Sequence, residues 1–389
     1  MGHGFFHTAS LQVNGSGRTY RYVYDCGSVA PSLVESRVES YFTNEELELR
    51  KPELDMLVLS HFHVDHINGV PHLLSKFKVK KLVLPFLSED FVLAALADLA
   101  ASGVEAWTEF SGLVLNPQTW MQERGQGDAQ VTQVRPDGPE GQDDRQNVNQ
   151  NGDISLPPGE VNHRVMGTLG APGDEYWDFK FYAHENWERY LLLLSALDAK
   201  FNPASEAAFL ACLSDPAWIA AHHAEVTEVF RSLGSSNQNG ITLCMYSGPR
   251  HKRIAHGYLG RWTYDPMSRH YFRDYDWRWR AESIGWLGTG DAELREPPLF
   301  DAFATHYQDF IGSVDTLTIP HHGSRENYCA SLGEVGQCAV LTSDHEEDPD
   351  EHHPSPQVMV NLRTKRSPVF IVTREMGTAL FNDGWVRIK

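Results

Sequence analysis

The chain of 389 residues is 41% hydrophobic and 22% charged, an ordinary composition for a folded protein. Acidic residues outnumber basic ones by 52 to 33, and the net charge of −19 argues against a protein that coats nucleic acid duplexes. The five cysteines are scattered and odd in number, which excludes a disulfide framework and a zinc ribbon. The N-terminal residues show no signal-peptide pattern, and no apolar run reaches the roughly 18 residues of a membrane-spanning helix. We therefore expect a cytoplasmic protein with no membrane contact.

The N-terminal part of the chain alternates between apolar strand patterns and helix signals. The expected strands are residues 11–13, 20–24, 54–59 and 81–84. Ser88 can cap a helix, because Glu89 and Asp90 follow it and carboxylates are favoured near the positive end of the helix dipole. This alternation is typical of an α/β fold.

The pattern becomes polar in the middle of the chain and regular again after it. Residues 120–160 are rich in Gly, Gln, Asp, Asn and Pro, which predicts a long surface segment. The expected later helices are 203–213, 220–233, 300–311 and 356–363, and the expected strands are 241–246 and 284–287. The chain is expected to close with a hairpin of residues 369–373 and 378–381, followed by a strand at 385–388.

The segment SHFHVDH at residues 60–66 carries the strongest chemical signal. Three imidazoles and a carboxylate lie within six residues, at the end of an expected buried strand, and burying them is costly unless a cation satisfies them. His61 and His63 can converge on one metal ion, and Asp65 and His66 can point to a second. Imidazole with carboxylate suits Zn, Mn or Fe better than Ca. The alternative is a polar loop whose histidines are incidental.

HFHVDH resembles the HxHxDH motif of the metallo-β-lactamase superfamily, which holds one or two metal ions. Other segments extend the resemblance to the metallo-β-lactamase-like domain of bacterial competence (DNA-uptake) channels. In chain order they are GHG at 2–4, YDCG at 24–27, NQNGI at 237–241, TGD at 289–291, PHHGS at 320–324, HPS at 353–355, GTA at 377–379 and NDG at 382–384. These matches follow the family order and span almost the whole chain.

This resemblance implies an α/β fold, a four-layer αβ/βα metallo-β-lactamase sandwich with a large insertion. Residues 1–389 would form a single domain, and residues 104–236 would be the insertion within it. The insertion would act as a lid or as a specificity module; the alternative is a decorative insertion or one that serves oligomerisation. The metal would be Zn or Mn, with one or two ions per chain. The implied metal ligands are His61, His63, Asp65, His66, Asp291 and His322.

The resemblance also assigns roles beyond simple ligation. Asp65 would additionally orient or deprotonate the nucleophilic water, and Asp291 would bridge the metals, although by itself it could cap a helix. His321 and His353 would face the substrate or support the ligands, so Asp65, His321 and His353 are the candidate catalytic residues. An alternative gives the last ligand role of His322 to either of these two histidines.

The chain departs from the family pattern at the third metal motif, usually a histidine between the first motif and TGD. Its expected place, residues 237–240, holds no histidine. The possible substitutes are His163, His184, His222, His223, His251 and His256. Each of them alone is more typical of a surface or core histidine than of a ligand.

Metal-activated water can attack phosphodiesters, lactones, thioesters and amides alike. The resemblance favours a phosphodiesterase or nuclease; the alternatives are a hydrolase of small esters, lactones or phosphocholine-type groups, and a catalytically silent metal-binding or regulatory protein. Residues 250–280 carry eight Lys or Arg against three acids, with interleaved aromatics, which predicts single-stranded nucleic acid or a nucleotide as partner. The competing interpretation is an amphipathic hairpin with aromatics inward and arginines outward, as the period of two over residues 277–280 suggests. The sequence indicates no oligomeric state.

Overall fold

The protein was analysed as a computed structural model. It describes residues 4–12, 19–44, 52–136, 154–156, 161–166, 175–185, 187–233, 241–249, 254–265, 270–274, 283–343, 353–365, 368–373 and 380–388. In this part of the chain, no helix combines the length and the apolar character needed to cross a membrane.

A six-stranded sheet occupies the N-terminal part of the fold. In spatial order its strands are β1 (Phe6–Gln12), β2 (Thr19–Cys26), β4 (Met56–Val58), β6 (Lys81–Pro85), β7 (Gln130–Val134) and β8 (Ile154–Leu156). β1 and β2 pair antiparallel, and the pairs from β2 to β8 are parallel. The carboxyl ends of β2, β4 and β6 therefore lie at one edge of this sheet.

A seven-stranded sheet faces the first one. In spatial order its strands are β17 (Val369–Val372), β16 (Cys338–Thr342), β15 (Val314–Thr318), β14 (Gly285–Gly288), β11 (Ile241–Pro249), β10 (Glu175–Glu185) and β9 (Val161–Met166). β14 to β17 pair in parallel, so the segments that follow β14, β15 and β16 emerge side by side. Two smaller sheets are β3 (Glu53–Leu54) with β5 (Lys78–Val79), and β13 (His270–Asp274), β12 (Ile254–Asp265) and β18 (Leu380–Ile388).

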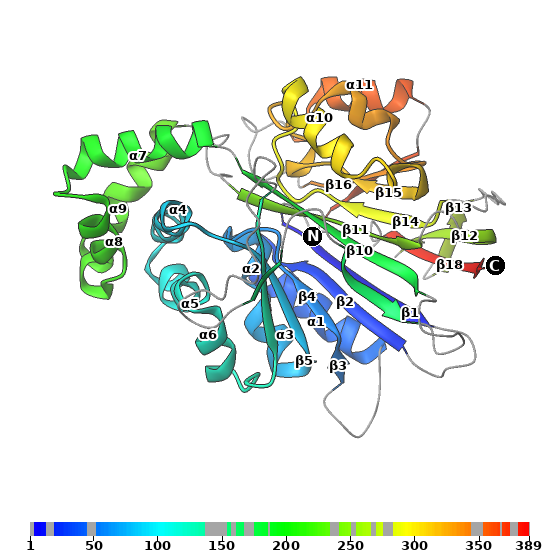
Figure 1. Cartoon of the computed structure of the whole chain (residues 1–389), viewed down its shortest axis with the longest axis horizontal. Coiled ribbons are helices and arrows are strands. Elements are labelled where there is room, and N and C mark those ends of the chain that lie inside the picture. The colour runs from blue at the N-terminus through cyan, green and yellow to red at the C-terminus, as the bar shows by residue number, and fades with distance from the viewer. Residues whose placement is uncertain are drawn as a thin grey trace.

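Helices cover the outer faces of both sheets (Figure 1). On the first sheet the helices are α1 (Pro31–Asn44), α2 (Val64–Ile67), α3 (Val70–Lys76), α4 (Glu89–Ala101), α5 (Val104–Leu115) and α6 (Pro117–Glu123). On the second sheet they are α10 (Pro297–His306) and α11 (Pro356–Thr364), which bury Phe303, Val358 and Leu362 against it. The short 3-10 helices are Ile311–Ser313, His321–Gly323 and Ala330–Glu334.

Apolar and aromatic side chains fill the space between the sheets. Tyr22, Met56 and Val83 of the first sheet belong to one buried cluster with Phe179 and Met245 of the second. The order helix, sheet, sheet, helix confirms the predicted α/β sandwich. Burying this much apolar surface is the main force that holds the layers together.

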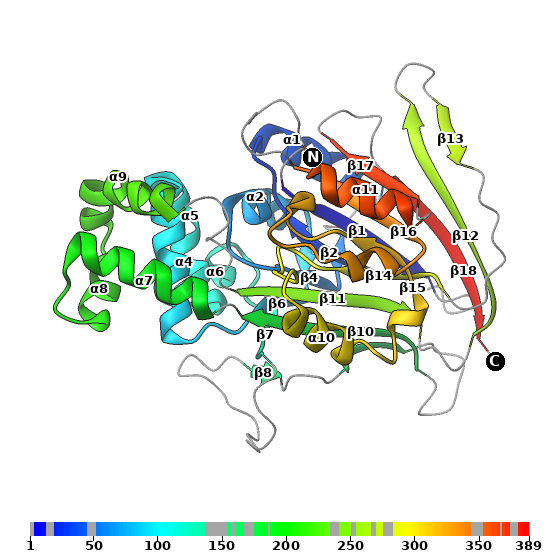
Figure 2. The same cartoon turned by 90° about the horizontal axis from the view of Figure 1, so that it is seen from above.

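Three further helices, α7 (Trp187–Phe201), α8 (Glu206–Leu213) and α9 (Pro216–Leu233), extend to one side of α4 and α5 (Figure 2). They belong to the same core cluster as the first sheet, through residues such as Leu197, Phe209 and Val226. The expected insertion, residues 104–236, thus contains these helices together with β7, β9 and β10, which pair within the two sheets.

Most expected elements are present, and two expectations were wrong. Ser88 caps α4 by accepting a hydrogen bond from the Phe91 amide at 3.5 Å. Part of the polar segment 120–160 is instead the buried strand β7, which pairs with β6 and buries Val131 and Val134 in two different core clusters. The described strands of the expected closing hairpin do not pair with each other, because β17 pairs with β16 while β18 pairs with β12.

Candidate metal centre

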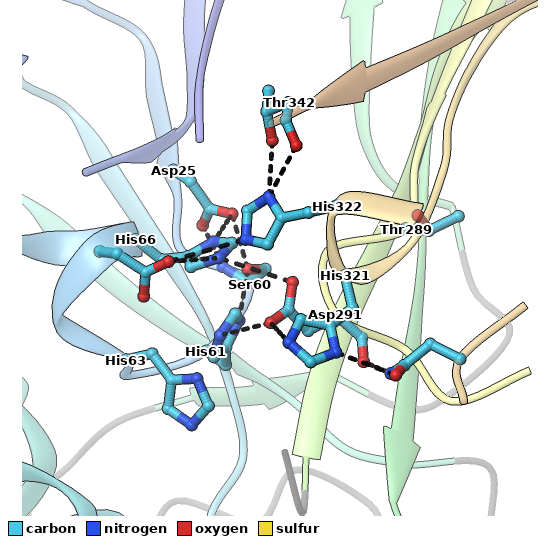
Figure 3. A network of polar contacts seen from close by, with 12 residues as sticks. Asp25, Ser60, His61, His63, His66, Thr289, Asp291, His321, His322 and Thr342 are labelled. Carbon is cyan, nitrogen blue, oxygen red and sulfur yellow. Dashed lines mark hydrogen bonds and ion pairs between the residues drawn. The ribbon is translucent and has the colours of Figure 1, made fainter. Parts of the chain in front are cut away.

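The centre forms where strands from both sheets end. The loop from Leu59 to His63 follows β4 and leads into α2, which carries Asp65 and His66. From the opposite sheet, Asp291 follows β14, and His321 and His322 follow β15. Figure 3 shows these side chains converging on one another from the two sides.

A buried carboxylate, Asp25 at the end of β2, organises the first side. It accepts hydrogen bonds from the Ser60 amide at 2.6 Å, from Ser60 Oγ at 2.6 Å and from His66 Nδ1 at 2.8 Å. Burial raises the pKa of Asp25, and the interactions with His66 and Ser60 oppose that rise. Asp25 therefore fixes both the loop and the His66 ring.

Each central imidazole is held through Nδ1, which turns its Nε2 towards the centre. His61 Nδ1 lies 2.8 Å from Ser60 Oγ, and His66 Nδ1 contacts Asp25. On the opposite side, His322 Nδ1 lies 2.8 Å from Thr342 Oγ1 and 3.1 Å from the Thr342 carbonyl. His321 Nδ1 lies 2.9 Å from Asn327 Oδ1. Such outer contacts fix the tautomer and orientation of metal-binding histidines.

The inward-facing ring nitrogens lie 3.5–3.8 Å from the carboxylates of Asp291 and Asp65. Asp291 lies 3.6 Å from His61 Nε2 and 3.5 Å from His66 Nε2, through different carboxylate oxygens. Asp65 Oδ2 lies 3.8 Å from His66 Nε2 and 3.7 Å from His322 Nε2. With metal–ligand bonds of about 2.0–2.2 Å, two ligands of one tetrahedral ion are roughly 3.3–3.6 Å apart. The spacings are thus close to those of ligands around a shared ion.

Two groups of possible ligands result among the described residues. The first is His61, His66 and Asp291, and the second is Asp65, His66 and His322; within each, the donor atoms lie within 4.8 Å of one another. The Nε2 atoms of His61 and His66 are buried and have no hydrogen-bond partner. A buried imidazole nitrogen without a partner is costly, and a cation would satisfy it. The donors therefore fit Zn or Mn, which accept nitrogen and carboxylate ligands.

Electrostatics also indicate that the centre is suited to a cation. Burial alone would lower the pKa of His66, but Asp291, Asp65 and Asp25 together raise it to about 10. Burial alone would raise the pKa of Asp291, but His321, His66 and His61 hold it well below its usual range. The carboxylates are thus ionised, and positive charge is stabilised between them.

The loop with TGD is fixed to its neighbours. Thr289 Oγ1 donates to the Thr318 carbonyl at 2.7 Å, and Asn327 Nδ2 donates to the Asp291 carbonyl at 2.9 Å. The next helix, α10, begins only at Pro297 and has Glu296 as its N-cap residue. Asp291 therefore directs its carboxylate to the histidines and caps no helix.

Glycines let the backbone approach the metal loop closely. A Cβ at Gly27 would lie 2.2 Å from the Asp65 carbonyl oxygen, and one at Gly4 would lie 2.6 Å from the same atom. His321 and His322 both have positive φ, of 46° and 55°, a conformation that is strained for residues other than glycine. These features give a structural reason for Gly4 of GHG, for Gly27 of YDCG and for the backbone conformation of HHGS.

The remaining predicted residues lie at the border of the centre. His63 is outside both donor groups; its ring centroid is 4.5 Å from that of His61, and its Nε2 is 3.7 Å from Asp98 Oδ2 (Figure 3). The His353 ring centroid is 5.3 Å from that of His321, whose Nε2 is 3.9 Å from Asp291 Oδ2.

None of the possible substitutes for the third histidine belongs to either donor group among the described residues. His184 is buried on β10, and His222 and His223 lie on α9, where His222 stacks on Trp218. His163 and His256 lie on β9 and β12, whose side chains are not described; His251 and residues 237–240 lie outside the described residues.

Sequence reasoning did not assign roles to Asp25, Asn327, Thr342 and Asp98. The sequence signal for Asp25 was its place in the motif YDCG. Asn327 and Thr342 act through contacts that only the packing of neighbouring loops creates.

Residues 4–96 match the family model described as "Metallo-beta-lactamase superfamily". The two facing sheets with outer helices are consistent with the metallo-β-lactamase fold, so the match and the fold together support this superfamily. No curated protein matches the chain.

Two solved structures are similar over most of their length. The metallo-beta-lactamase fold protein YhfI from Bacillus subtilis is 11% identical, with 94% of this chain and 88% of that chain covered and a TM-score of 0.30. Unliganded yeast PDE1 is 10% identical, with 96% and 98% covered and a TM-score of 0.37. Likenesses this distant say nothing about the activity of this protein.

Proposed function

We propose that this protein is a metal-dependent hydrolase that cleaves phosphodiesters, with Zn or Mn at a centre of one or two ions. The observation that carries the proposal is the pair of donor groups that share His66, with the carboxylates Asp291 and Asp65 between the imidazoles. Bound metal would lower the pKa of its water towards about 7 and stabilise attacking and leaving oxygens.

The exposure of the side chains indicates where substrate would approach. Asp65 is 25% exposed, and His63 and His321 are 16% and 15% exposed, whereas His66 and Asp291 are at most 4% exposed. Asp65 is therefore the carboxylate of the centre that water reaches most easily. We assign it the task of orienting the nucleophilic water and taking up its proton, with His321 beside the substrate.

Two features support a phosphodiester over other substrates. The order of motifs resembles the competence-channel branch, which is associated with DNA. The basic aromatic segment 250–280 offers cations and stacking rings for nucleic acid; its strands β12 and β13 pair with each other, but its side chains lie outside the described residues.

Metal analysis with a substrate panel tests the proposal. The purified protein should contain Zn or Mn and cleave bis-p-nitrophenyl phosphate, single-stranded DNA, RNA or cyclic nucleotides with at least one of Zn, Mn and Mg. Activity confined to lactones or phosphocholine esters would establish the small-ester alternative. Metal binding with no hydrolysis of any of these would establish a silent binding protein.

Asp291→Asn serves as the matched variant in this panel. The change keeps the shape but removes the anionic charge between His61 and His66. We expect kcat to fall by at least about 100-fold, or about 3 kcal/mol of transition-state stabilisation. Near-normal turnover would show that Asp291 does not support the reaction.

A further inference from the structure

Helix α4 contains a carboxylate that its surroundings do not explain. The helix reads EDFVLAALADLAA, and its buried residues are apolar except for Asp98, which is 8% exposed. Asp98 also lies near the carboxyl end of the helix, where the dipole disfavours negative charge. A buried acid in an apolar helix is costly unless a cationic group or an ion compensates it.

The partner of Asp98 is a histidine of the metal motif. Asp98 Oδ2 lies 3.7 Å from Nε2 of His63. This is longer than a hydrogen bond but within the range of 3.5–3.9 Å found between the imidazoles and carboxylates of the centre. The contact also involves Nε2, the same ring atom that His61 and His66 direct inward. The distance between His63 Nε2 and Asp98 Oδ2 is therefore close to that between two ligands of one metal ion.

The position of Asp98 in the chain adds an independent argument. The family pattern expects one more ligand between the first motif and TGD, that is, between His66 and Asp291, and none of the histidines in that interval joins a donor group among the described residues. Asp98 lies in this interval and reaches the loop of the first motif.

We propose that Asp98 takes the place of the absent third imidazole and, with His61 and His63, binds the first metal ion. This inference rests on the proposed function. The three donors do not form a closed group like the two described above, so His63 must shift towards His61, whose ring centroid is 4.5 Å away. The side chain of His63 is 16% exposed, which leaves it room to do so.

An oxygen ligand in place of a nitrogen has a chemical consequence. Imidazole suits Zn, whereas carboxylate also suits Mn and Mg. The first position should therefore discriminate less between Zn and Mn than a position with three imidazoles. Asp98→His would restore the third imidazole and should shift the preference towards Zn.

Metal binding by the apoprotein tests the inference without any activity measurement. The full-length protein is stripped with a chelator and titrated separately with Zn and Mn; bound metal is counted by elemental analysis, and Mn is followed by electron paramagnetic resonance. We expect two equivalents for the wild type. Asp98→Asn should weaken one equivalent by at least about 100-fold, the upper end of losses seen for residues that merely support ligands. Asp98→His should regain it with a stronger preference for Zn.

Glu89→Gln is the control, because it removes an exposed carboxylate from the same helix and should retain both equivalents. Unchanged metal number and affinity in Asp98→Asn would overturn the inference. If Asp98→Asn does not fold, the test rests on Asp98→His. If Asp98→His folds but binds one metal equivalent fewer than the wild type, the inference is also overturned. A wild type that binds two ions but hydrolyses nothing would refute the proposed function and leave the role of Asp98 intact.

Discussion

Replacing Asp25 by asparagine, a side chain of nearly the same size, should weaken metal binding at the centre. One Asp25 oxygen accepts from the Ser60 amide, and the other accepts from Ser60 Oγ and contacts His66 Nδ1. In Asp25→Asn, the amide group must replace one of these oxygens. If the amide NH₂ faces the Ser60 amide, two N–H donors oppose each other. If the NH₂ faces His66, it donates to Nδ1, so Nδ1 must act as the acceptor and the ring proton of His66 moves to Nε2.

A proton on Nε2 of His66 would block both donor groups, because this atom belongs to each of them. Loss of such an outer partner weakens metal binding by about 10–100-fold, which corresponds to about 1.4–2.7 kcal/mol. Competition with a chromophoric chelator should show this loss for both equivalents. A variant that binds metal within about threefold of the wild type would refute the reasoning.

Asp55→Asn provides the matched control. Asp55 is also buried, and it accepts from the Arg21 amide and from Lys80 Nζ, both at 2.9 Å. It lies just before β4, at the end of the strand opposite the metal loop. Its replacement should lower the free energy of unfolding by about 1–3 kcal/mol, since a charged hydrogen bond is weakened, and leave metal affinity unchanged.

Three further changes test other parts of the reasoning. Gly27→Ala should lower the free energy of unfolding by about 1–3 kcal/mol and weaken metal binding, because the new Cβ would meet the Asp65 carbonyl oxygen. A thermal melt and a metal titration that both match the wild type would contradict this. The pKa of His7 is lowered to about 3 by burial, so between pH 6.5 and 3 only the unfolded chain takes up the proton and stability falls as pH falls. Between pH 7.5 and 5, the free energy of unfolding measured in urea should therefore fall by up to about 2 kcal/mol less in His7→Phe than in the wild type. Equal losses would exclude a lowered pKa for His7. If residues 250–280 bind nucleic acid, replacing Arg278 and Arg280 by Glu should raise KM for an oligonucleotide relative to KM for bis-p-nitrophenyl phosphate. The slope of log K for oligonucleotide binding against log salt concentration should become shallower by about 1.4. An unchanged slope would argue for a small substrate.

The sequence alone determined the fold class and the main candidates for metal binding. Short apolar strands alternating with helix signals predict α/β layers, because these patterns report local burial and local backbone preference. The metal candidates are recognisable because an HxHxDH run concentrates chemistry that is costly to bury without a cation. The structure brings five of the six into the two donor groups: His61, Asp65, His66, Asp291 and His322.

Only the tertiary structure decided how distant segments share this centre. Strand β7 reads as a polar loop, and it is a strand because β6 offers it a partner edge. The separation of β17 from β18 likewise depends on which sheet edge each strand meets. The contacts of His66 with Asp25 and of His63 with Asp98 join residues 41 and 35 positions apart, which no local pattern records. A sequence reveals which groups can bind a metal, but the packing of strand ends against one another determines which of those groups meet.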